Sequence, residues 1–393
     1  MGGVSMEWKE VRLGDIADVQ TGPFGSQLHK SDYIAEGIPC IMPTNIGSHL
    51  NFIVDGIAHV SEVDANRLSR HLTKFGDIIY ARRGDIEKCA YVTTNEEKWL
   101  CGTGCLKIRC NNGVNSRFIA YQLSTAECKK WITGNAVGTT MLNLSKGILS
   151  KLPLLVPSHE DQRRIASILS SLDRKIELNN KINADLEEMA QAVFKNWFVD
   201  FEPFKDGKFV DSELGMIPEG WKVGLLGELC NFKRGKNLLT KNAIDEGVPV
   251  VAGGLEPSCY HNVANTGAPV ITVSGSGANA GFMRMYHVPV WASDCSFIDI
   301  TCENFYFVYC FLKVNSKLLK HAQTGAVQPH VKPSDIHDFE LVIPDKESIF
   351  DFQDKVKPFF DKIALIQKEN SRLSLLRDTL LPRLMSGEIE VPE

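Results

Sequence analysis

The sequence predicts an α+β protein in which two tandem-repeat globular parts, each with a mixed sheet and short helices, are separated by two long helices that form an antiparallel coiled coil. Three observations support this prediction. Motifs recur in the same order in the two halves of the chain, two polar helical segments carry a narrow apolar seam, and each globular part consists of short apolar runs between glycine-rich connections.

The repeated motifs indicate an internal duplication. The motif WK followed by LG at Trp8 recurs at Trp221, and LLVP ending at Pro157 recurs as LVIP ending at Pro344. From there the two copies stay 187 residues apart (157 to 344), so the helices match in register while the loops of the globular parts differ. The predicted regions are residues 1–155 and 205–343, which are globular, and residues 156–204 and 344–393, which are helical.

The segments 172–197 and 359–384 have the period of a coiled coil. Their seam residues follow alternating steps of four and three, and at about 1.5 Å per residue each segment spans roughly 39 Å. Asn183 and Asn370 occupy equivalent seam positions, where a buried polar residue fixes register. The alternative is two unrelated surface helices that each pack on their own domain. The predicted seam residues are Leu172, Ile176, Asn183, Leu186, Val193, Trp197, Phe359, Ile363, Asn370, Leu373, Leu380 and Leu384.

Local signals set the expected helix boundaries. Pro358 predicts an interruption that separates a lead-in helix at about 346–356 from the seam helix. The matching place in the first copy, Ser170 and Ser171, predicts a bend. We also expect one short helix at the end of each globular part, near 117–132 and 305–321.

Composition limits the kind of protein. A chain of 393 residues is too long for one ordinary core, and a formal charge of −5 argues against a surface that binds nucleic acid everywhere. Any contact with DNA must therefore come from local patches. Eleven cysteines, mostly in apolar runs, suit reduced thiols in the cytoplasm. No stretch is apolar enough for a membrane span, and the N-terminus lacks the apolar core of a signal peptide.

Sequence motifs of catalysis are absent, so we predict no catalytic, cofactor-binding or metal-binding residue in this chain. There is no phosphate-binding G-x-x-x-x-G-K-[ST] loop and no Asp/Asn-Pro-Pro-aromatic tetrapeptide of an amino-methyltransferase. The glycines from Gly275 to Gly281 imitate a dinucleotide fingerprint, but a strand-like run follows them where a helix is required. Cys101, Cys105 and Cys110 have no histidine nearby and read as buried thiols.

Polar loops are the positive signal. The loop 80–88 carries Arg82 and Arg83, and the repeat places it opposite 272–280, with Gly84 matched to Gly275. The first loop presents guanidinium groups, which fit guanine O6 and N7, and the second presents hydroxyls and an amide, which suits adenine N6 and N7. Two loops that keep their position but differ in polar groups indicate two readers of different DNA sequences. The alternative is that the arginines form structural ion pairs and the other residues cap turns.

Further candidates lie in loops that match by position, and their lysines suit phosphates better than bases. In the first globular part the predicted DNA-binding residues are Thr21, Phe24, Ser26, Gln27, Lys30, Arg82, Arg83, Lys88, Thr139, Thr140, Asn143 and Lys146. In the second they are Lys233, Arg234, Lys236, Asn237, Ser274, Ser276, Asn279, Arg284, Gln323, Thr324, Gln328, His330 and Lys332.

Together these features resemble the specificity subunit of type I restriction-modification systems, a family in which two target-recognition domains alternate with two conserved helical regions. The resemblance covers essentially the whole chain and rests on the order of soft motifs. The motifs are WKEVRLGDI and WKVGLLGEL, EGIP and EGVP, VSGSGANAGFM, TGAVQPHVKPSDI, SELGMIPEGW, LLVPSHEDQRRIASILSSLDRKIELNNKIN and LLPRLMSGEIE. The first part departs from the pattern, with Arg-Arg-Gly in place of Gly-Ser-Gly in its reading loop.

The resemblance implies a mechanism. Target-recognition domains 1 (1–155) and 2 (205–343) would each read one half of a bipartite site in double-stranded DNA. The central (156–204) and C-terminal (344–393) helical regions would set the spacer and dock two methyltransferase (modification) subunits. Those subunits would supply S-adenosylmethionine, and restriction/translocase subunits would supply ATP- and Mg-dependent translocation and cleavage. Two alternatives stay open: a protein-only coiled-coil adaptor, and a stand-alone DNA-modifying enzyme with unrecognised motifs.

Overall fold

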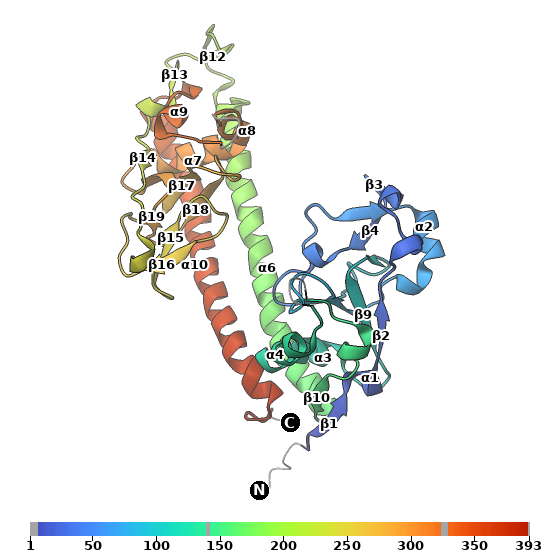
Figure 1. Cartoon of the computed structure of the whole chain (residues 1–393). Coiled ribbons are helices and arrows are strands. Elements are labelled where there is room, and N and C mark those ends of the chain that lie inside the picture. The colour runs from blue at the N-terminus through green and yellow to red at the C-terminus, as the bar shows by residue number, and fades with distance from the viewer. Residues whose placement is uncertain (1–6, 139–141, 324–328, 392–393) are drawn as a thin grey trace. The chain divides into compact units, whose positions relative to one another are not determined.

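The computed structural model describes residues 7–138, 142–323 and 329–391 (Figure 1). It divides into two units, Met1–Leu178 with Asn370–Glu393 and Asn179–Glu369, which are described separately. Both boundaries fall inside long helices, α6 (His159–Phe198) and α10 (Lys346–Met385). Helices and strands occur together in each unit, as the predicted α+β class requires.

The first unit contains two four-stranded sheets, one wholly antiparallel and one mixed. The strand order of the antiparallel sheet is β2-β9-β6-β7, and that of the mixed sheet is β3-β5-β4-β8, in which only β4 and β8 are parallel. A separate pair, β1 (Lys9–Arg12) and β10 (Pro153–Val156), joins the beginning and the end of the globular part. The strands of the two sheets are β2 (Ala17–Thr21), β3 (Tyr33–Ile34), β4 (Ile38–Ile41), β5 (Ala58–Val60), β6 (Ile78–Ala81), β7 (Cys89–Tyr91), β8 (Leu100–Cys101) and β9 (Cys105–Cys110).

Short helices pack on the antiparallel sheet β2-β9-β6-β7 and connect it to the long helices. The core packs Phe118 of one short helix and Ile108 of the sheet with Ile165 of α6 and Leu384 of α10. The α-helices are α1 (Leu13–Ile16), α2 (Glu62–Arg67), α3 (Ser116–Leu123), α4 (Ala126–Asn135) and α5 (Lys146–Leu149), and the 3-10 helices are η1 (Gly25–Gln27), η2 (Lys30–Asp32), η3 (Pro43–Asn45) and η4 (Ser69–His71).

The second unit repeats this topology. The order β14-β20-β17-β18 matches β2-β9-β6-β7, and the order β16-β15-β19, with its parallel pair β15 and β19, matches β5-β4-β8. The internal duplication predicted from the sequence is therefore confirmed. The strands are β11 (Phe209–Val210), β12 (Ile217–Pro218), β13 (Lys222–Leu225), β14 (Lys233–Arg234), β15 (Val248–Val251), β16 (Cys259–His261), β17 (Val270–Ser274), β18 (Met283–Tyr286), β19 (Trp291–Ala292), β20 (Cys295–Asp299) and β21 (Glu340–Ile343).

The helices of the second unit surround a core rich in aromatic rings. Phe352 of α10 lies 5.1 Å from Phe198 and 5.7 Å from Phe194, both of α6, between ring centroids. β13 pairs with β21 as β1 does with β10. The helices are α7 (Phe305–Val314), α8 (Ser316–His321), α9 (Pro333–His337), η5 (Glu202–Phe204), η6 (Leu226–Glu228) and η7 (Thr240–Asn242).

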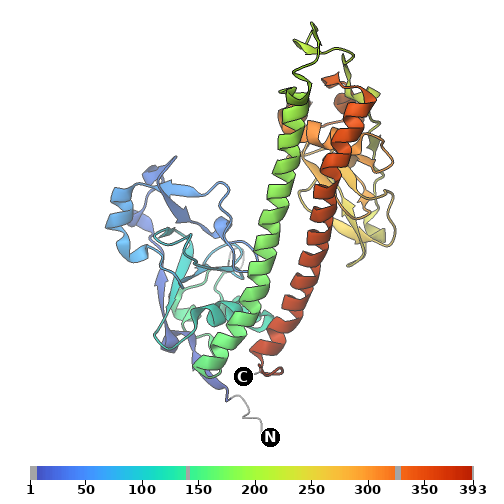
Figure 2. The ribbon, with the colours of Figure 1, turned by 180° about the vertical axis from the view of Figure 1, so that it is seen from behind.

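Both long helices are continuous over 40 residues, which corrects the interruption expected at Pro358 (Figure 2). Pro358 does not interrupt α10, because it lies on the exposed side between buried Val356 and Phe360, whose packing outweighs one missing hydrogen bond. α6 also continues through Ser170 and Ser171, where the sequence predicts a bend. Their hydroxyls donate to backbone carbonyls of the preceding turn, at 3.3 and 2.7 Å, a contact that is common where helices bend.

The single short helix expected at the end of each globular part is in fact two. α3 ends before Thr125, whose side chain accepts a hydrogen bond from the backbone of Cys128 and starts α4. In the second unit Asn315 separates α7 from α8. The apolar pattern runs through both helices of each pair, so the sequence did not reveal the breaks.

The predicted seam residues are all buried or half-buried. Within the second unit, Asn179 of α6 donates to Glu369 of α10 at 2.8 Å. Within the first unit, Arg377 of α10 forms an ion pair with Asp173 of α6 at 3.0 Å. Neither Asn183 nor Asn370 is exposed. Across the described ranges, no helix is both long and apolar enough to cross a membrane.

Candidate nucleic-acid interface

In the first unit three loops meet at one end of the antiparallel sheet β2-β9-β6-β7. Gly22, which follows β2, donates its backbone N–H to Cys105 O at 3.0 Å. Arg82, which follows β6, donates to Gly104 O at 2.8 Å and accepts from Leu144 N at 2.9 Å. The loops 22–27, 82–88 and 142–146 are thus fixed beside one another by backbone hydrogen bonds, whatever side chains they carry.

The side chains of these loops are partly engaged and partly free to meet a ligand. Arg82 is half-buried and donates to Asn143 Oδ1 at 3.2 Å, whereas Arg83 is exposed. Lys88 pairs with Asp85 at 3.2 Å and Lys146 with Asp18 at 3.3 Å, both at the surface. Surface pairs of this kind contribute little to stability and open readily towards phosphates. The ion-pair alternative therefore describes the two lysines better than the two arginines.

The loop after β2 presents an aromatic ring. Phe24 is 59% exposed, and Ser26 and Lys30 are also exposed. The backbone below is held firmly, because Thr103 donates to Pro23 O at 2.9 Å and Arg67 donates to Gln27 O at 2.9 Å. The Gln27 side-chain oxygen, in contrast, is buried and has no partner among the described residues. Thr21 ends β2 and is half-buried.

The second unit builds the same three-loop arrangement. Gly235 donates to Cys295 O at 2.8 Å, Gly275 donates to Asp294 O at 3.1 Å, and Val331 donates to Gly275 O at 3.1 Å. A Cβ atom on Gly235 would overlap Ser293 O, just as one on Gly22 would overlap Gly102 O. Only glycine permits this close approach of two backbones.

These hydrogen bonds correct the alignment of the two reading loops. The backbone of Arg83 pairs with Asn143, and that of Ser276 pairs with His330. Gly84 therefore matches Gly277, two residues beyond the predicted Gly275, and both glycines have positive φ, +75° and +80°. The similarity between the loops is too low to fix the offset, and only the strand register reveals it.

An aspartate that the sequence did not indicate organises the second site. Asp294 accepts from Arg234, the last residue of β14, and from the Ser276 hydroxyl in the loop after β17. Lys233, Lys236 and Asn237 are exposed beside it. No repeated motif marks Asp294, because its role depends on the meeting of two loops distant in sequence.

Several predicted residues of the second unit have structural partners. Arg284 pairs with Glu256 at 3.0 Å and lies over the Tyr286 ring, 5.0 Å from its centroid. Asn279 donates to Gly253 O at 3.4 Å and Gln323 to Ala280 O at 2.8 Å. Here the turn-capping alternative fits the geometry.

The remaining predictions are placed as follows. Ser274 is buried within β17, and the Lys332 backbone N–H donates to Asp335 Oδ2 at 2.8 Å, at the start of α9. Thr139, Thr140, Thr324 and Gln328 lie outside the described residues.

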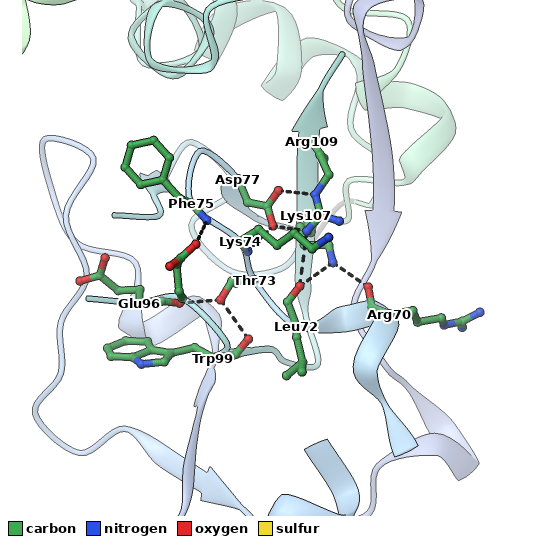
Figure 3. A network of polar contacts seen from close by, with 11 residues as sticks. Arg70, Leu72, Thr73, Lys74, Phe75, Asp77, Glu96, Trp99, Lys107 and Arg109 are labelled. Atoms are coloured by element: carbon green, nitrogen blue, oxygen red, sulfur yellow. Dashed lines mark hydrogen bonds and ion pairs between the residues drawn. The ribbon is translucent and has the colours of Figure 1, made fainter. Parts of the chain in front are cut away.

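A polar network lies beyond the other end of β6 in the first unit (Figure 3). Lys107 of β9 donates to the carbonyls of Arg70 and Leu72 at 2.6 and 3.0 Å, and Arg109 pairs with Asp77 at 2.6 Å. Burial, reinforced by the neighbouring Arg109, lowers the pKa of Lys107. The network fixes the segment before β6, and thereby the strand that carries Arg82.

The chemistry of the described residues gives no sign of a reactive centre. Among them no three His, Cys, Asp or Glu side chains are grouped to hold a metal ion. Cys101 and Cys105 are fully buried, and burial raises the pKa of the Cys101 thiol to about 12, far from a reactive thiolate. The exposed hydrogen-bond donors on loops that backbone hydrogen bonds hold in place are suited to binding a ligand.

A duplicated pair of domains with polar loops, joined by long helices, is the architecture of a binding protein with two related sites. The family model of the type I restriction modification DNA specificity domain matches residues 6–188 and 218–375, which is most of the chain. The chain therefore belongs to this family. Specificity subunits are the non-catalytic chains of type I restriction-modification systems.

Individual relatives agree with this assignment. The chain is 29% identical to the type I restriction enzyme MjaIX specificity subunit of Methanocaldococcus jannaschii, over 100% of this chain and 96% of the relative. It is 27% identical to the HindI specificity subunit of Haemophilus influenzae, over 98% and 100%. The crystal structure of a type I restriction-modification S subunit from M. genitalium has a TM-score of 0.61 at 19% identity, covers 98% of this chain and 97% of that chain, and shows the same fold.

Proposed function

We propose that this chain is the sequence-reading subunit of a type I restriction-modification complex, and that each unit reads one half of a bipartite site in double-stranded DNA. One observation carries the proposal. The three-loop arrangement occurs twice on equivalent backbone hydrogen bonds, but the loops present arginines in one unit and Ser276 with Asp294 and Arg234 in the other. Recognition of two different half-sites requires the same backbone arrangement in both units and different hydrogen-bonding side chains on the loops.

In the first unit Arg83 and Arg82 are the proposed base readers. An exposed guanidinium matches guanine O6 and N7 in the major groove, and the Arg82 contact to Asn143 orients the second one. Exposed Phe24 supplies an apolar contact to a base or methyl group. Lys30, Lys88 and Lys146 are assigned to phosphates, which position the protein without reading sequence.

In the second unit we assign base reading to Ser276 and Arg234, which Asp294 holds together. Lys233 of β14 and, in the loop that follows, Lys236 and Asn237 are exposed and suit phosphates or the groove edge. The different side chains lead us to expect a half-site different from that of the first unit.

We propose further that α6 and α10 form an antiparallel coiled coil that sets the spacer between the half-sites. The burial of the seam residues and the contacts Asn179–Glu369 and Asp173–Arg377 support this pairing. A 40-residue helix is about 60 Å long, so it can separate half-sites one helical turn, about 34 Å, apart.

The helices are also the proposed docking elements for two modification subunits. Leu178 and Met189 of α6 are 54% and 50% exposed, and the 187-residue shift places them at Leu365 and Leu376 of α10, 64% and 47% exposed. Eleven residues are three turns, so each pair shares a helix face. Equivalent apolar positions on both copies suit two copies of one partner. S-adenosylmethionine, ATP and Mg then belong to partner subunits, and the assembly is expected in the cytoplasm with the DNA.

The test is a domain exchange followed by mapping of methylated bases. In the complex with modification subunits, replacing residues 1–155 by the corresponding domain of another specificity subunit should change one half-site only. The matched exchange of residues 205–343 should change the other. A change in both half-sites from one exchange would refute modular reading, and a complex that selects no site would favour the protein-only adaptor.

Removing one heptad from α6 together with the matching heptad of α10 tests the spacer. The deletion removes about 10 Å of rod, so the preferred spacer should become shorter while both half-sites stay the same. Gel shifts with duplexes of graded spacer length measure this. An unchanged spacer preference would reject the role of the helices in setting distance.

A further inference from the structure

A groove lined by arginines lies in the first unit, on a surface that the proposed DNA contacts do not use. It has a volume of about 680 Å³ and is formed by α3, the first half of α6 and the C-terminal Val391. Four guanidinium groups line it, together with the single carboxylate of Glu160. The arginines are Arg117, Arg163, Arg164 and Arg174.

Two of these arginines are already occupied and two are available. Arg164 pairs with Glu160 at 2.8 Å and with Asp161 at 3.6 Å, and Arg117 lies over the Tyr91 ring, 4.4 Å from its centroid. Arg163 and Arg174 are exposed and form no ion pair within the described part of the chain. They are eleven residues apart on α6, so both point from the same helix face.

The duplicated helix does not carry this feature. The 187-residue shift places Phe350, Asp351 and Asp361 where the first copy has Arg163, Arg164 and Arg174. Phe350 is 68% exposed, and Asp361 pairs with Lys357 at 2.6 Å. The fold therefore does not require arginines here, and a contact that uses them occurs once per chain.

The position of the groove argues against a phosphate contact in the proposed DNA interface. The Oγ of Ser116, the first residue of α3, lies 3.4 Å from the Tyr91 hydroxyl. In the sheet, Tyr91 pairs with Ile78 at the start of β6. The reading loop begins after Ala81, at the other end of that strand. Half-buried Ile168 adds apolar surface beside the arginines, above buried Ala166 and Val391, and an apolar contact suits a peptide better than a nucleic-acid backbone.

We propose that this groove binds an acidic peptide segment of a partner protein, once per chain. Carboxylates of that segment form bidentate ion pairs with Arg163 and Arg174, and an apolar side chain rests on Ile168. That the partner is a subunit of the restriction-modification assembly rests on the proposed function, whereas binding of an acidic peptide does not.

The experiment compares two charge-reversed variants of the full chain. Arg163→Glu with Arg174→Glu alters the groove, and Lys362→Glu with Arg372→Glu, exposed on α10, makes the same change in net charge elsewhere. Fluorescence anisotropy measures binding of a labelled peptide of alternating glutamate and leucine and of a random-sequence DNA duplex. Circular dichroism and the urea midpoint verify that both variants fold.

We expect the groove variant to bind the peptide at least tenfold more weakly than the wild-type chain, with the control within twofold. Equal peptide binding by the groove variant and the control would overturn the proposal. A selective loss of duplex binding by the groove variant would also overturn it and would identify a phosphate site.

A second readout uses the complex with its modification and restriction subunits. The groove variant should retain one kind of partner subunit at least tenfold more weakly, while the methylated half-sites stay unchanged; undiminished retention of every subunit would overturn the assignment of the partner to this assembly. Failure of the wild-type complex to select a bipartite site would instead contradict the proposed function and leave the peptide result standing.

Discussion

The two units share a backbone frame but stabilise the contact between the long helices with opposite chemistry. In the first unit Asp173 of α6 and Arg377 of α10 form a buried ion pair, and the Tyr121 hydroxyl donates to Asp173. The 187-residue shift replaces them by Phe360 and Ala190, which lie in the apolar core of the second unit. The same backbone arrangement therefore accepts either an ion pair or an apolar contact at these positions, provided that both residues of the pair are of the matching kind.

A similar reversal occurs in the four-stranded sheets. After Ile108 of β9 comes Arg109, which donates to Asp77, and after Ile298 of β20 comes Asp299, which accepts from the backbone of Gly267 at 2.8 Å. β9 thus holds the segment before β6 through the cation of Arg109. β20 holds the segment before β17 through the anion of Asp299. Strand register is retained, whereas the sign of the charge is not.

The largest expected effect comes from breaking the buried ion pair. Arg377→Ala leaves the partly buried Asp173 with the Tyr121 hydroxyl but without its cation, and should reduce the free energy of unfolding by about 3 kcal/mol, the lower end for a buried pair. Adding Asp173→Phe installs the pair of the second unit and should recover most of that loss, apart from the acceptor of the Tyr121 hydroxyl. Urea unfolding of the wild type and both variants measures this. If the double variant is no more stable than the single one, the two solutions are not interchangeable.

A smaller effect concerns pH, because the first unit buries His71 beside two cations. Burial, with Arg70 and Lys107 nearby, lowers the pKa of His71 from 6.5 to about 4. Above pH 6.5 the residue is neutral in the folded and unfolded chain, and its contribution is complete. As the pH falls towards 4, only the unfolded chain takes up the proton, so stability drops by up to about 3 kcal/mol. Urea unfolding at pH 7 and pH 5 should show a smaller difference for His71→Gln; an equal difference would contradict this assignment.

The smallest expected effect tests the feature that the two units share. Gly22→Ala and Gly235→Ala each force a Cβ against a backbone carbonyl, and each should cost about 1 to 3 kcal/mol. Each substitution should also weaken selection of the half-site read by its own unit and leave the other intact. Methylation mapping with the single variants decides this. Impairment of the same half-site by both would show that the loops do not act independently.

The sequence was sufficient for the repeat, the long helices and the buried positions of the seam, because these depend on patterns within one segment. It was not sufficient for features that arise where distant segments meet. Asp294, the network of Lys107 with Arg70 and the match of Gly84 with Gly277 all depend on strand pairing. Pro358 does not follow the local rule for proline, because the buried residues on either side hold the helix together.

The pairing of β1 with β10, and of β13 with β21, has a consequence for evolution. The chain enters and leaves each globular part at neighbouring points, Lys9 opposite Val156 in one unit and Lys222 opposite Ile343 in the other. A segment with adjoining ends can be cut out and replaced by recombination while the flanking rods stay continuous. Under the proposed function, new pairs of half-sites can therefore arise by exchange of whole inserts, without point mutations that rebuild a loop.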